Sequence, residues 1–352
     1  MTTHIFDQRI QHVTPEILSL IAKIDELKGR WVAGAQLNPI VLDRLKRSVL
    51  ITSTGASTRI EGALLSDEDV DKLMHGISIE KFSDRDKQEV RGYFELLQNV
   101  FSSWEDLRLS EGLVKHFHKE LLKYTEKDKA HRGEYKGKEN KVQMINAVGE
   151  SVGALFDTTP AFRTPSVMVE LIEWTQNSLT EKRYHPLLII GNFLVEFLLI
   201  HPFEDGNGRL SRVITNLLLL REGYFYMPYV SHEKLIEDNK PEYYLALRTS
   251  QKAIQADQNN ISDWLSFFLK ILLMQSQMAV NVLSAEDIEK TLSPNQLAAW
   301  LYLQKVKEAT PLEISKYAEI ARPTVNQVME KLLKLKRVER LGLGRATRYR
   351  II

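Results

Sequence analysis

The chain has 352 residues, of which 43% are hydrophobic and 26% charged, with a net charge of +1 at pH 7. This length and composition indicate a globular protein with two or three domains and a sizeable core. The absence of cysteine excludes disulfides and thiolate metal sites, and MTTHIFDQRI at the N-terminus lacks the apolar core of a secretory signal. We therefore expect a cytoplasmic protein that does not bind membranes.

Apolar residues recur with helical spacing along most of the chain, and few segments alternate as strands do. The fold class is therefore predicted to be mainly all-α. We expect an N-terminal helical region at residues 1–110 and a helical core at residues 111–283. The clearest helical patterns cover Pro15–Leu27, Val41–Ser53, Asp86–Ser102, Val167–Leu179 and Ile261–Ser284.

Two shorter patterns in this part have local interpretations. The spacing of Thr58 and Glu61 before Ala63–Leu65 is that of a capping box at the start of a helix. His116 and His118 have the spacing of metal ligands, but they fall in a helical pattern with no third ligand nearby. We expect both histidines to be structural.

The most informative segment runs from His201 to Arg212 with the sequence HPFEDGNGRLSR. It follows Pro186–Ile200, which is apolar on nearly all sides and indicates a buried helix rather than a membrane span. Helical spacing resumes after it, so Gly206–Gly208 is predicted to form the turn into a second helix.

Such a turn is suited to an anion. Glycines let successive N–H groups converge on one point, and a helix N-terminus adds about half a positive charge. Arg209 and Arg212 share a helix face from which they can hold phosphates, and Asp205 suits a magnesium ion. His201 suits a general base near neutral pH. The segment predicts nucleotidyl or phosphoryl transfer.

The segment matches the signature of the Fic family, H-x-F-x-[DE]-G-N-G-R-x-x-R, at every defined position, so the chain resembles that family. Fic proteins are mostly helical and usually transfer AMP from ATP to a protein hydroxyl. The resemblance implies that His201 is the catalytic base and Asp205 the Mg²⁺ ligand. The ATP-binding residues it implies in this segment are Gly206, Asn207, Gly208, Arg209, Leu210, Ser211 and Arg212. Glycine at position 208, where relatives with lysine can act as kinases, favours AMP transfer.

The resemblance also gives Ser57–Gly62 a second interpretation. The segment matches the family's inhibitory motif, [ST]-x-x-x-E-[GN], in which the glutamate pairs with the second arginine of the signature. Ser57, Glu61, Gly62 and Arg212 are then regulatory residues, and Glu61 also borders the nucleotide. We favour this interpretation over the capping box.

Two further segments resemble parts of Fic proteins. Asn239 to Tyr244 resembles the segment that closes over the adenosine, so Asn239 and Tyr243 are expected to bind the nucleotide; the alternative is that Tyr243 belongs to the core. Arg132–Lys136 and the following Val142–Phe156 resemble the flap, a β-hairpin beside the active site with Gly149 near its turn. The flap is expected to hold the target peptide by strand addition, unless it is an ordinary surface hairpin.

Residues 284–352 are predicted to form a linker, near Ser284–Ser293, and a winged-helix domain. From Thr291 onward there are 12 Lys and Arg against 5 Asp and Glu, a net of +7, whereas the remainder of the chain has a net charge of −6. This asymmetry favours DNA binding through the helix Pro323–Leu335; a protein-interaction or dimer module is the alternative. The expected base contacts are Arg322, Thr324, Asn326 and Gln327.

Together these patterns predict an autoinhibited protein adenylyltransferase that uses ATP and Mg²⁺. Its expected substrate is a Ser, Thr or Tyr hydroxyl of a protein, including itself, and self-association as a homodimer is plausible from the family. The alternatives are a DNA-binding regulator with a nucleotide-sensing Fic domain, or a Fic enzyme with another donor or with deAMPylase activity.

Overall fold

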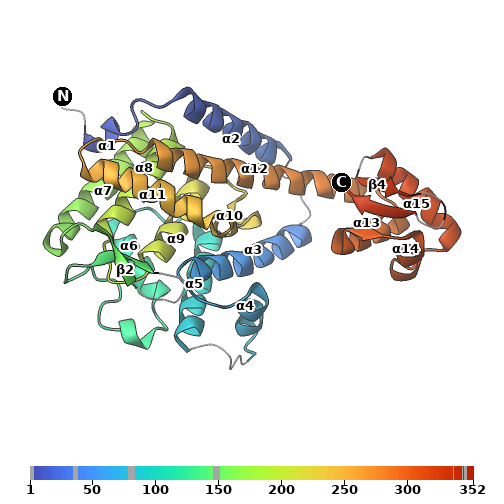
Figure 1. Ribbon diagram of the computed structural model, residues 1–352, viewed down its shortest axis with the longest axis horizontal. Coiled ribbons are helices and arrows are strands. Elements are labelled where there is room, and N and C mark those ends of the chain that lie inside the picture. The colour runs from blue at the N-terminus through green and yellow to red at the C-terminus, as the bar shows by residue number, and fades with distance from the viewer. Residues whose placement is uncertain are drawn as a thin grey trace. The chain divides into compact units, whose positions relative to one another are not determined.

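The computed structural model describes residues 4–34, 39–77, 84–145, 151–335, 337–342, 344 and 347–352. The chain divides into two compact units, Met1–Val280 and Asn281–Ile352. The fold is mainly helical with two small antiparallel sheets, as predicted (Figure 1).

The first unit contains the expected helices and several shorter ones. Its N-terminal half has α1 (Ile5–Gln8), α2 (Pro15–Gly34), α3 (Pro39–Ile60), α4 (Asp67–Met74), α5 (Asp84–Ser103) and α6 (Glu111–Leu121). The helices that follow are α7 (Thr164–Glu181), α8 (Pro186–Ile200), α9 (Asn207–Arg221), α10 (His232–Asp238), α11 (Lys240–Gln255) and α12 (Ser262–Thr291). Single 3₁₀ turns lie at Glu126–Asp128, Ala161–Arg163 and Met227–Tyr229.

The centre of this unit is the pair α8 and α9. Every residue of α8 from Leu187 to Ile200 is buried, which explains why its sequence is apolar on all sides. Helix α8 packs against α7, α9 and α11, and α9 packs against α5. The polar segment predicted to carry the chemistry therefore joins two helices held by the core.

Helix α3 ends beside this segment. Gly62, with φ of 104°, and Ala63 turn the chain out of the helix, and the Ala63 N–H donates to the Thr58 carbonyl. Thr58 thus lies in the last turn of α3, and the capping-box interpretation of Thr58 and Glu61 was wrong. A capping box does begin α4, but it is formed by Ser66 and Asp69.

The Arg59 guanidinium fixes the end of α3 in place. It binds both carboxylate oxygens of Glu237 on α10, at 2.6 and 3.0 Å, and it pairs with Asp67 at the start of α4. The residue after α3, Glu61, therefore projects from an anchored helix end.

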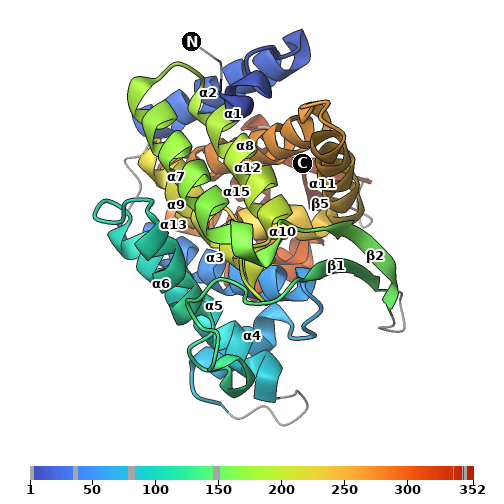
Figure 2. The ribbon, with the colours of Figure 1, turned by 90° about the vertical axis from the view of Figure 1, so that its left-hand side faces the viewer.

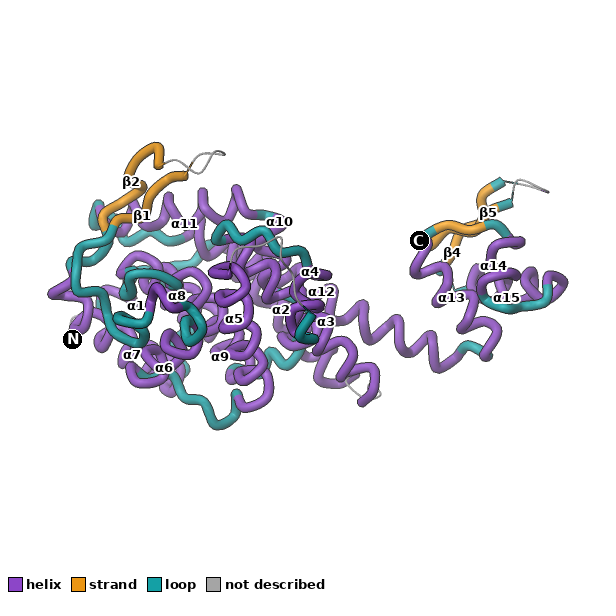
Figure 3. Tube along the Cα trace, turned by 90° about the horizontal axis from the view of Figure 1, so that it is seen from below, coloured by secondary structure: helices purple, strands orange, loops and turns teal. Residues whose placement is uncertain are grey.

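Strands β1 (Lys141–Ile145) and β2 (Ser151–Asp157) pair antiparallel, and the hairpin projects from the helices (Figures 2 and 3). This agrees with the small flap hairpin expected at Val142–Phe156. The register shifts twice, between Val142 and Gln143 and between Met144 and Ile145. Gly149 lies outside the described residues.

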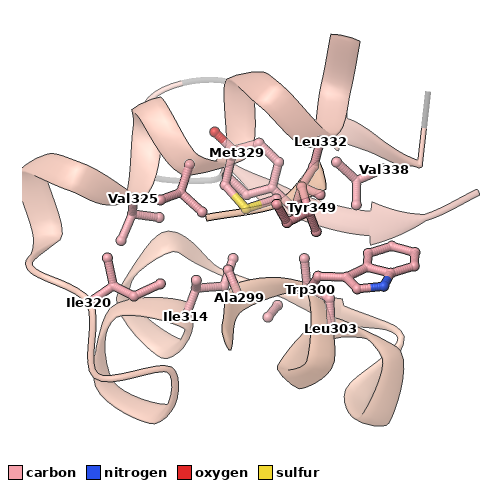
Figure 4. Close-up of a cluster of buried hydrophobic side chains, with 13 residues drawn as sticks. Ala299, Trp300, Leu303, Ile314, Ile320, Val325, Met329, Leu332, Val338 and Tyr349 are labelled. Atoms are coloured by element: carbon pink, nitrogen blue, oxygen red, sulfur yellow. The ribbon is translucent and has the colours of Figure 1, made fainter. Parts of the chain in front are cut away.

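In the described residues the second unit has, after the end of α12, three helices and a three-stranded sheet in the order β3-β5-β4. Its elements are α13 (Pro294–Val306), β3 (Glu308–Ala309), α14 (Pro311–Tyr317), α15 (Arg322–Lys334), β4 (Val338–Leu341) and β5 (Arg348–Ile351). Its core includes Trp300, Val325, Met329 and Tyr349 (Figure 4). The expected linker is helical as far as Thr291, because α12 continues through it.

One described helix segment, Ser262–Leu283, is long and apolar enough to cross a membrane. Because 44% of its most apolar window is buried, and core helices pass the same test, it is weak evidence for a membrane span.

Candidate functional site

The segment predicted to carry the chemistry forms a tight turn between α8 and α9. His201 ends α8 in the left-handed conformation, with φ of 51° and ψ of 62°. Gly206, with φ of 80°, directly precedes α9, which starts at Asn207. The predicted helix–turn–helix is confirmed, and the N–H groups at the start of α9 face the turn.

Asn207 closes the turn on itself. Its side-chain oxygen accepts from the Phe203 N–H at 3.0 Å, and its side-chain nitrogen donates to the Phe203 carbonyl at 2.8 Å. The Asn207 side chain, which is 1% exposed, therefore stabilises the turn.

His118 holds the same turn from α6. Its Nε2 lies 3.0 Å from the Asp205 carbonyl, its Nδ1 accepts from the Gly133 N–H, and its ring stacks on Phe203 with 3.8 Å between centroids. Burial lowers the pKa of His118 to about 4. This neutral histidine has the structural role that we predicted, but its position beside the site was not foreseen.

Asp205 and Arg209 form a charged cluster with two residues of α5. Arg209 pairs with Glu89 at 2.7 Å and with Asp205 at 3.0 Å, and Arg85 reaches Asp205 at 3.1 Å. Burial opposes ionisation of Asp205, but the positive charge of Arg209 and the hydrogen bond from the Gly206 N–H outweigh it, so the pKa of Asp205 is lowered. Arg85 and Glu89 were missed because only the fold brings α5 to this turn.

Arg212 meets the inhibitory motif, as the resemblance implied. Its Nη2 donates to Glu61 Oε1 at 2.8 Å and to the Ser57 carbonyl at 2.9 Å, and its Nε donates to Ser57 Oγ at 2.8 Å. The Arg212 side chain is 3% exposed and that of Glu61 is 33% exposed. Gly62 contributes only the turn after α3.

Glu61 lies over the N-terminus of α9. A Cβ atom at Gly208 would be only 2.2 Å from Glu61 Oε1, so glycine is needed for this approach. The carboxylate follows the C-terminal end of α3, where a negative charge is disfavoured, and adjoins the N-terminal end of α9, where it is favoured. An anion thus already sits at the predicted phosphate site.

Three residues predicted to contact the nucleotide have buried side chains, and one of them, Tyr243, lies against Arg212. Leu210 is fully buried, and its N–H donates a hydrogen bond to the Gly206 carbonyl. The Ser211 hydroxyl donates to the Gly208 carbonyl, and Tyr243 is 4% exposed; both line an internal cavity of about 20 Å³. In this arrangement the core alternative describes Tyr243.

Asn239 and Tyr244 lie at the junction of α10 and α11. The Asn239 side chain donates to the Leu235 carbonyl at 2.8 Å and so closes α10. The hydroxyl of Tyr244 lies 3.4 Å from the Ile60 carbonyl, at the end of α3. Tyr244 therefore reaches the end of α3, next to the inhibitory motif.

His201 is electrically neutral at pH 7 in this setting. Burial lowers its pKa to about 4, and the nearby Lys136 charge acts in the same direction, whereas the Leu198 carbonyl, Glu61 and Asp205 oppose the shift. The imidazole is therefore in the unprotonated state that a general base requires, but at this pKa it is a weaker base than an ordinary histidine.

The turn offers unused hydrogen-bond donors of the kind that bind phosphate oxygens. Nη1 of Arg212 is buried without a hydrogen-bond partner in the described residues, and the start of α9 supplies N–H donors. No described group of three acidic or histidine side chains could hold a metal. Asp205 alone could provide the single carboxylate with which Mg²⁺ bound to phosphates is commonly held.

This geometry is that of a helical domain built around a turn between two buried helices, and comparison shows what it is similar to. Residues 108–219 match the family model described as the Fic/DOC family, so the chain contains a Fic domain. A crystal structure of a Fic family protein from Desulfovibrio desulfuricans is similar over 97% of both chains, with 26% identity and a TM-score of 0.63.

Curated relatives match over shorter stretches. A probable protein adenylyltransferase of Aquifex aeolicus is 32% identical over 84 residues, which is 24% of this chain and 25% of the relative. The protein adenylyltransferase Fic of Aedes aegypti is 39% identical over 59 residues, or 17% of this chain and 12% of the relative. The matched stretches thus span a quarter or less of these relatives.

Proposed function

We propose that this protein is an ATP- and Mg²⁺-dependent protein adenylyltransferase held inactive by Glu61. The observation that carries the proposal is that His201, the N-terminus of α9 and Arg212 lie together along one short segment, with Glu61 against Arg212. The two relatives named as adenylyltransferases support the reaction class.

The proposed reaction transfers the AMP group from ATP to the target hydroxyl and the hydroxyl proton to His201. His201 takes the proton of a Ser, Thr or Tyr hydroxyl on the target, and the hydroxyl oxygen bonds to the α-phosphorus of ATP. The bond from that phosphorus to the oxygen bridging to the β-phosphate breaks, and pyrophosphate leaves. Arg209, Arg212 and the N–H groups of α9 would hold the phosphates.

A magnesium ion would neutralise phosphate charge beside Asp205. Asp205 is the residue that would hold this ion. That carboxylate now binds Arg209 and Arg85, so the arginines would exchange Asp205 for phosphate oxygens when ATP binds.

Glu61 would act as the brake in two ways. It occupies the Arg212 guanidinium at 2.8 Å, and its negative charge lies where a phosphate would have to be. The negative charges of Glu61 and of a phosphate would repel each other strongly in this partly buried site. ATP would then bind with its outer phosphates displaced.

The target would bind along the flap. Strands β1 and β2 form a two-stranded sheet whose outer edges are open to a third strand among the described residues. An extended target segment, from this chain or another protein, could pair with one of these edges and present its hydroxyl to His201. A homodimer stays a prediction.

The test is transfer of α-phosphate label from ATP. Glu61→Gly protein is incubated with labelled ATP and Mg²⁺, alone and with cell extract, beside Glu61→Gly/His201→Ala protein. We expect protein labelling that depends on His201. Absence of label with ATP, but labelling with another nucleotide donor, would support the alternative donor; loss of label from an AMP-modified target would indicate deAMPylase activity.

A second candidate function, DNA binding, is favoured by the second unit. Its element order is that of a winged helix, and the charge of residues 291–352 is +7. Helix α15 exposes Arg322, Asn326, Gln327 and Lys331, whereas Thr324 is half-buried. This face could enter a major groove.

Binding to a fluorescent duplex should weaken steeply with salt. Lys331→Glu should reduce it, whereas Lys305→Glu on α13 should change it less. A protein that shifts to a dimer without binding DNA would instead favour the interaction module. Salt-dependent DNA binding together with no transfer by Glu61→Gly protein would favour the nucleotide-sensing regulator.

A further inference from the structure

Lys136 is a buried cation that the proposed reaction does not use. Lys136 is 3% exposed, and its Nζ donates to the Ile200 carbonyl at 2.9 Å, Asn140 Oδ1 at 2.8 Å and Thr158 Oγ1 at 2.7 Å. These three acceptors are neutral. Burial lowers the pKa of Lys136 to about 8, with the charge of Glu139 opposing the shift. A charge kept in the interior at such a cost indicates a task beyond packing.

The backbone groups that Lys136 and Asn140 bind lie on both sides of His201. Ile200 is the last residue of α8, and the Lys136 N–H donates to the carbonyl of Pro202 at 2.9 Å. The Asn140 side chain donates to the Phe203 carbonyl at 3.0 Å. One short segment thus holds the backbone on both sides of a histidine whose left-handed conformation is disfavoured. The ammonium group at the C-terminus of α8 is also favoured by the helix dipole.

The same segment joins the two ends of the flap. Asn140 directly precedes β1, and Thr158 directly follows β2. The Thr158 hydroxyl lies 2.9 Å from the Asn140 carbonyl, and both side chains bind Lys136. A change at the base of the hairpin would therefore act on Lys136, which holds the backbone beside His201.

We propose that Lys136 is a positioning residue that couples the base of the β1–β2 hairpin to the orientation of His201. Asn140 and Thr158 hold Lys136, and Lys136 and Asn140 hold the backbone around His201, so a target strand that pairs with the hairpin would bind next to the group that positions His201. This inference rests on the proposed function for its catalytic consequence, but the positioning contacts do not depend on it.

Charge supports the same assignment. The charged groups that act on the His201 ring are Lys136, which lowers its pKa, and Glu61 and Asp205, which raise it. Because burial and Lys136 act together, the ring stays neutral. Replacing Lys136 by a neutral residue should let His201 accept a proton at higher pH.

The kinetic test uses the Glu61→Gly protein as the parent. Lys136→Met keeps the length of the side chain and removes its charge and donors, and Lys138→Met is the matched control because Lys138 is exposed on the same segment. We expect kcat for label transfer to fall about 10- to 100-fold in Lys136→Met, since small misplacements of a reacting group cost this much. The KM for ATP should change less than twofold. Lys136→Arg should recover part of kcat.

An equal kcat in Lys136→Met and Lys138→Met would overturn the proposal, as would a loss confined to the KM for ATP. If Lys136→Met does not fold, Thr158→Val removes one acceptor while retaining the lysine. It should lower kcat less, with the KM for ATP unchanged. An unchanged kcat in Thr158→Val would then count against the coupling.

A second measurement separates this inference from the proposed function. If the Glu61→Gly parent transfers no label, the proposed function fails, but NMR titration of the His201 ring still tests Lys136. We expect His201 to titrate at a higher pH in Lys136→Met and at the parental pH in Lys138→Met. Superimposable titrations in all three proteins would show that Lys136 does not set the state of His201.

Discussion

Removing the Glu61 carboxylate should activate the enzyme by an amount that the Arg212 contact allows us to work out. The hydrogen bond of 2.8 Å joins a buried guanidinium to a carboxylate that is one-third exposed. Such charge-assisted bonds contribute about 1.5–3 kcal/mol, and about 1.4 kcal/mol corresponds to tenfold in an equilibrium. Glu61→Gly should therefore raise the rate of transfer at low ATP by about 10- to 100-fold.

The assay is the initial rate of label transfer at ATP concentrations below KM. Glu61→Ala separates loss of the carboxylate from added backbone freedom, and should match Glu61→Gly. Glu61→Gln keeps a hydrogen-bond acceptor without the charge, and should be intermediate. Equal rates for wild type and all three variants would refute the idea that this carboxylate blocks the phosphate site.

The same change should have the opposite effect on stability. Without Glu61, the Arg212 guanidinium keeps its two bonds to Ser57 but loses its nearest negative charge. Leaving a buried charge less well paired costs about 1–3 kcal/mol. Urea unfolding should show Glu61→Gly protein to be less stable than wild type, and added ATP should restore part of that stability.

Three further predictions concern the groups around this turn. Gly208→Ala should lower the unfolding free energy by about 1 kcal/mol in wild type, because the new Cβ meets the Glu61 carboxylate. The loss should be much smaller in Glu61→Gly protein, and additive effects in a double-mutant cycle would contradict this contact. Arg209→Met should cost about 3 kcal/mol in thermal or urea unfolding, since Glu89 is left buried without its closest cation, and adding Glu89→Gln should recover part of the loss. Because the folded pKa of His118 is about 4 and its ordinary value is 6.5, the unfolded chain binds more protons between these values, and stability falls by roughly 3 kcal/mol as the pH falls through that window. Urea unfolding at pH 7 and near pH 4 should show a smaller loss for His118→Gln, and an equal loss would contradict the assignment.

The local parts of the site could be predicted from sequence because their residues are contiguous. An apolar run, two glycines and renewed helical spacing describe the turn from α8 to α9 without reference to any other element. The same holds for the helices of both units, whose periodicity records one buried face. The position of His201 at the end of a buried helix followed directly.

The pairing of Glu61 with Arg212 is different in kind. Family resemblance suggested it, whereas the spacing of Thr58 and Glu61 suggested a capping box. The structure has no capping box at these two residues, because Thr58 lies in the last turn of α3. The two residues are 151 positions apart, and no periodicity relates them. Their meeting depends on how α3 packs, with Arg59 fixing its end on Glu237.

What the sequence by itself determined, therefore, was a mainly helical protein with a glycine-containing turn between two buried helices and a basic C-terminal region. Tertiary structure alone decided which side chains the turn meets, namely Arg85 and Glu89 from α5 and Lys136 from the base of the flap. It also decided that the Tyr243 side chain is buried. The physical reason is that helical periodicity and turn chemistry act over a few residues. The partners of a buried charge, in contrast, depend on which distant elements pack together, and hydrophobic periodicity specifies the face that packs but not the neighbour.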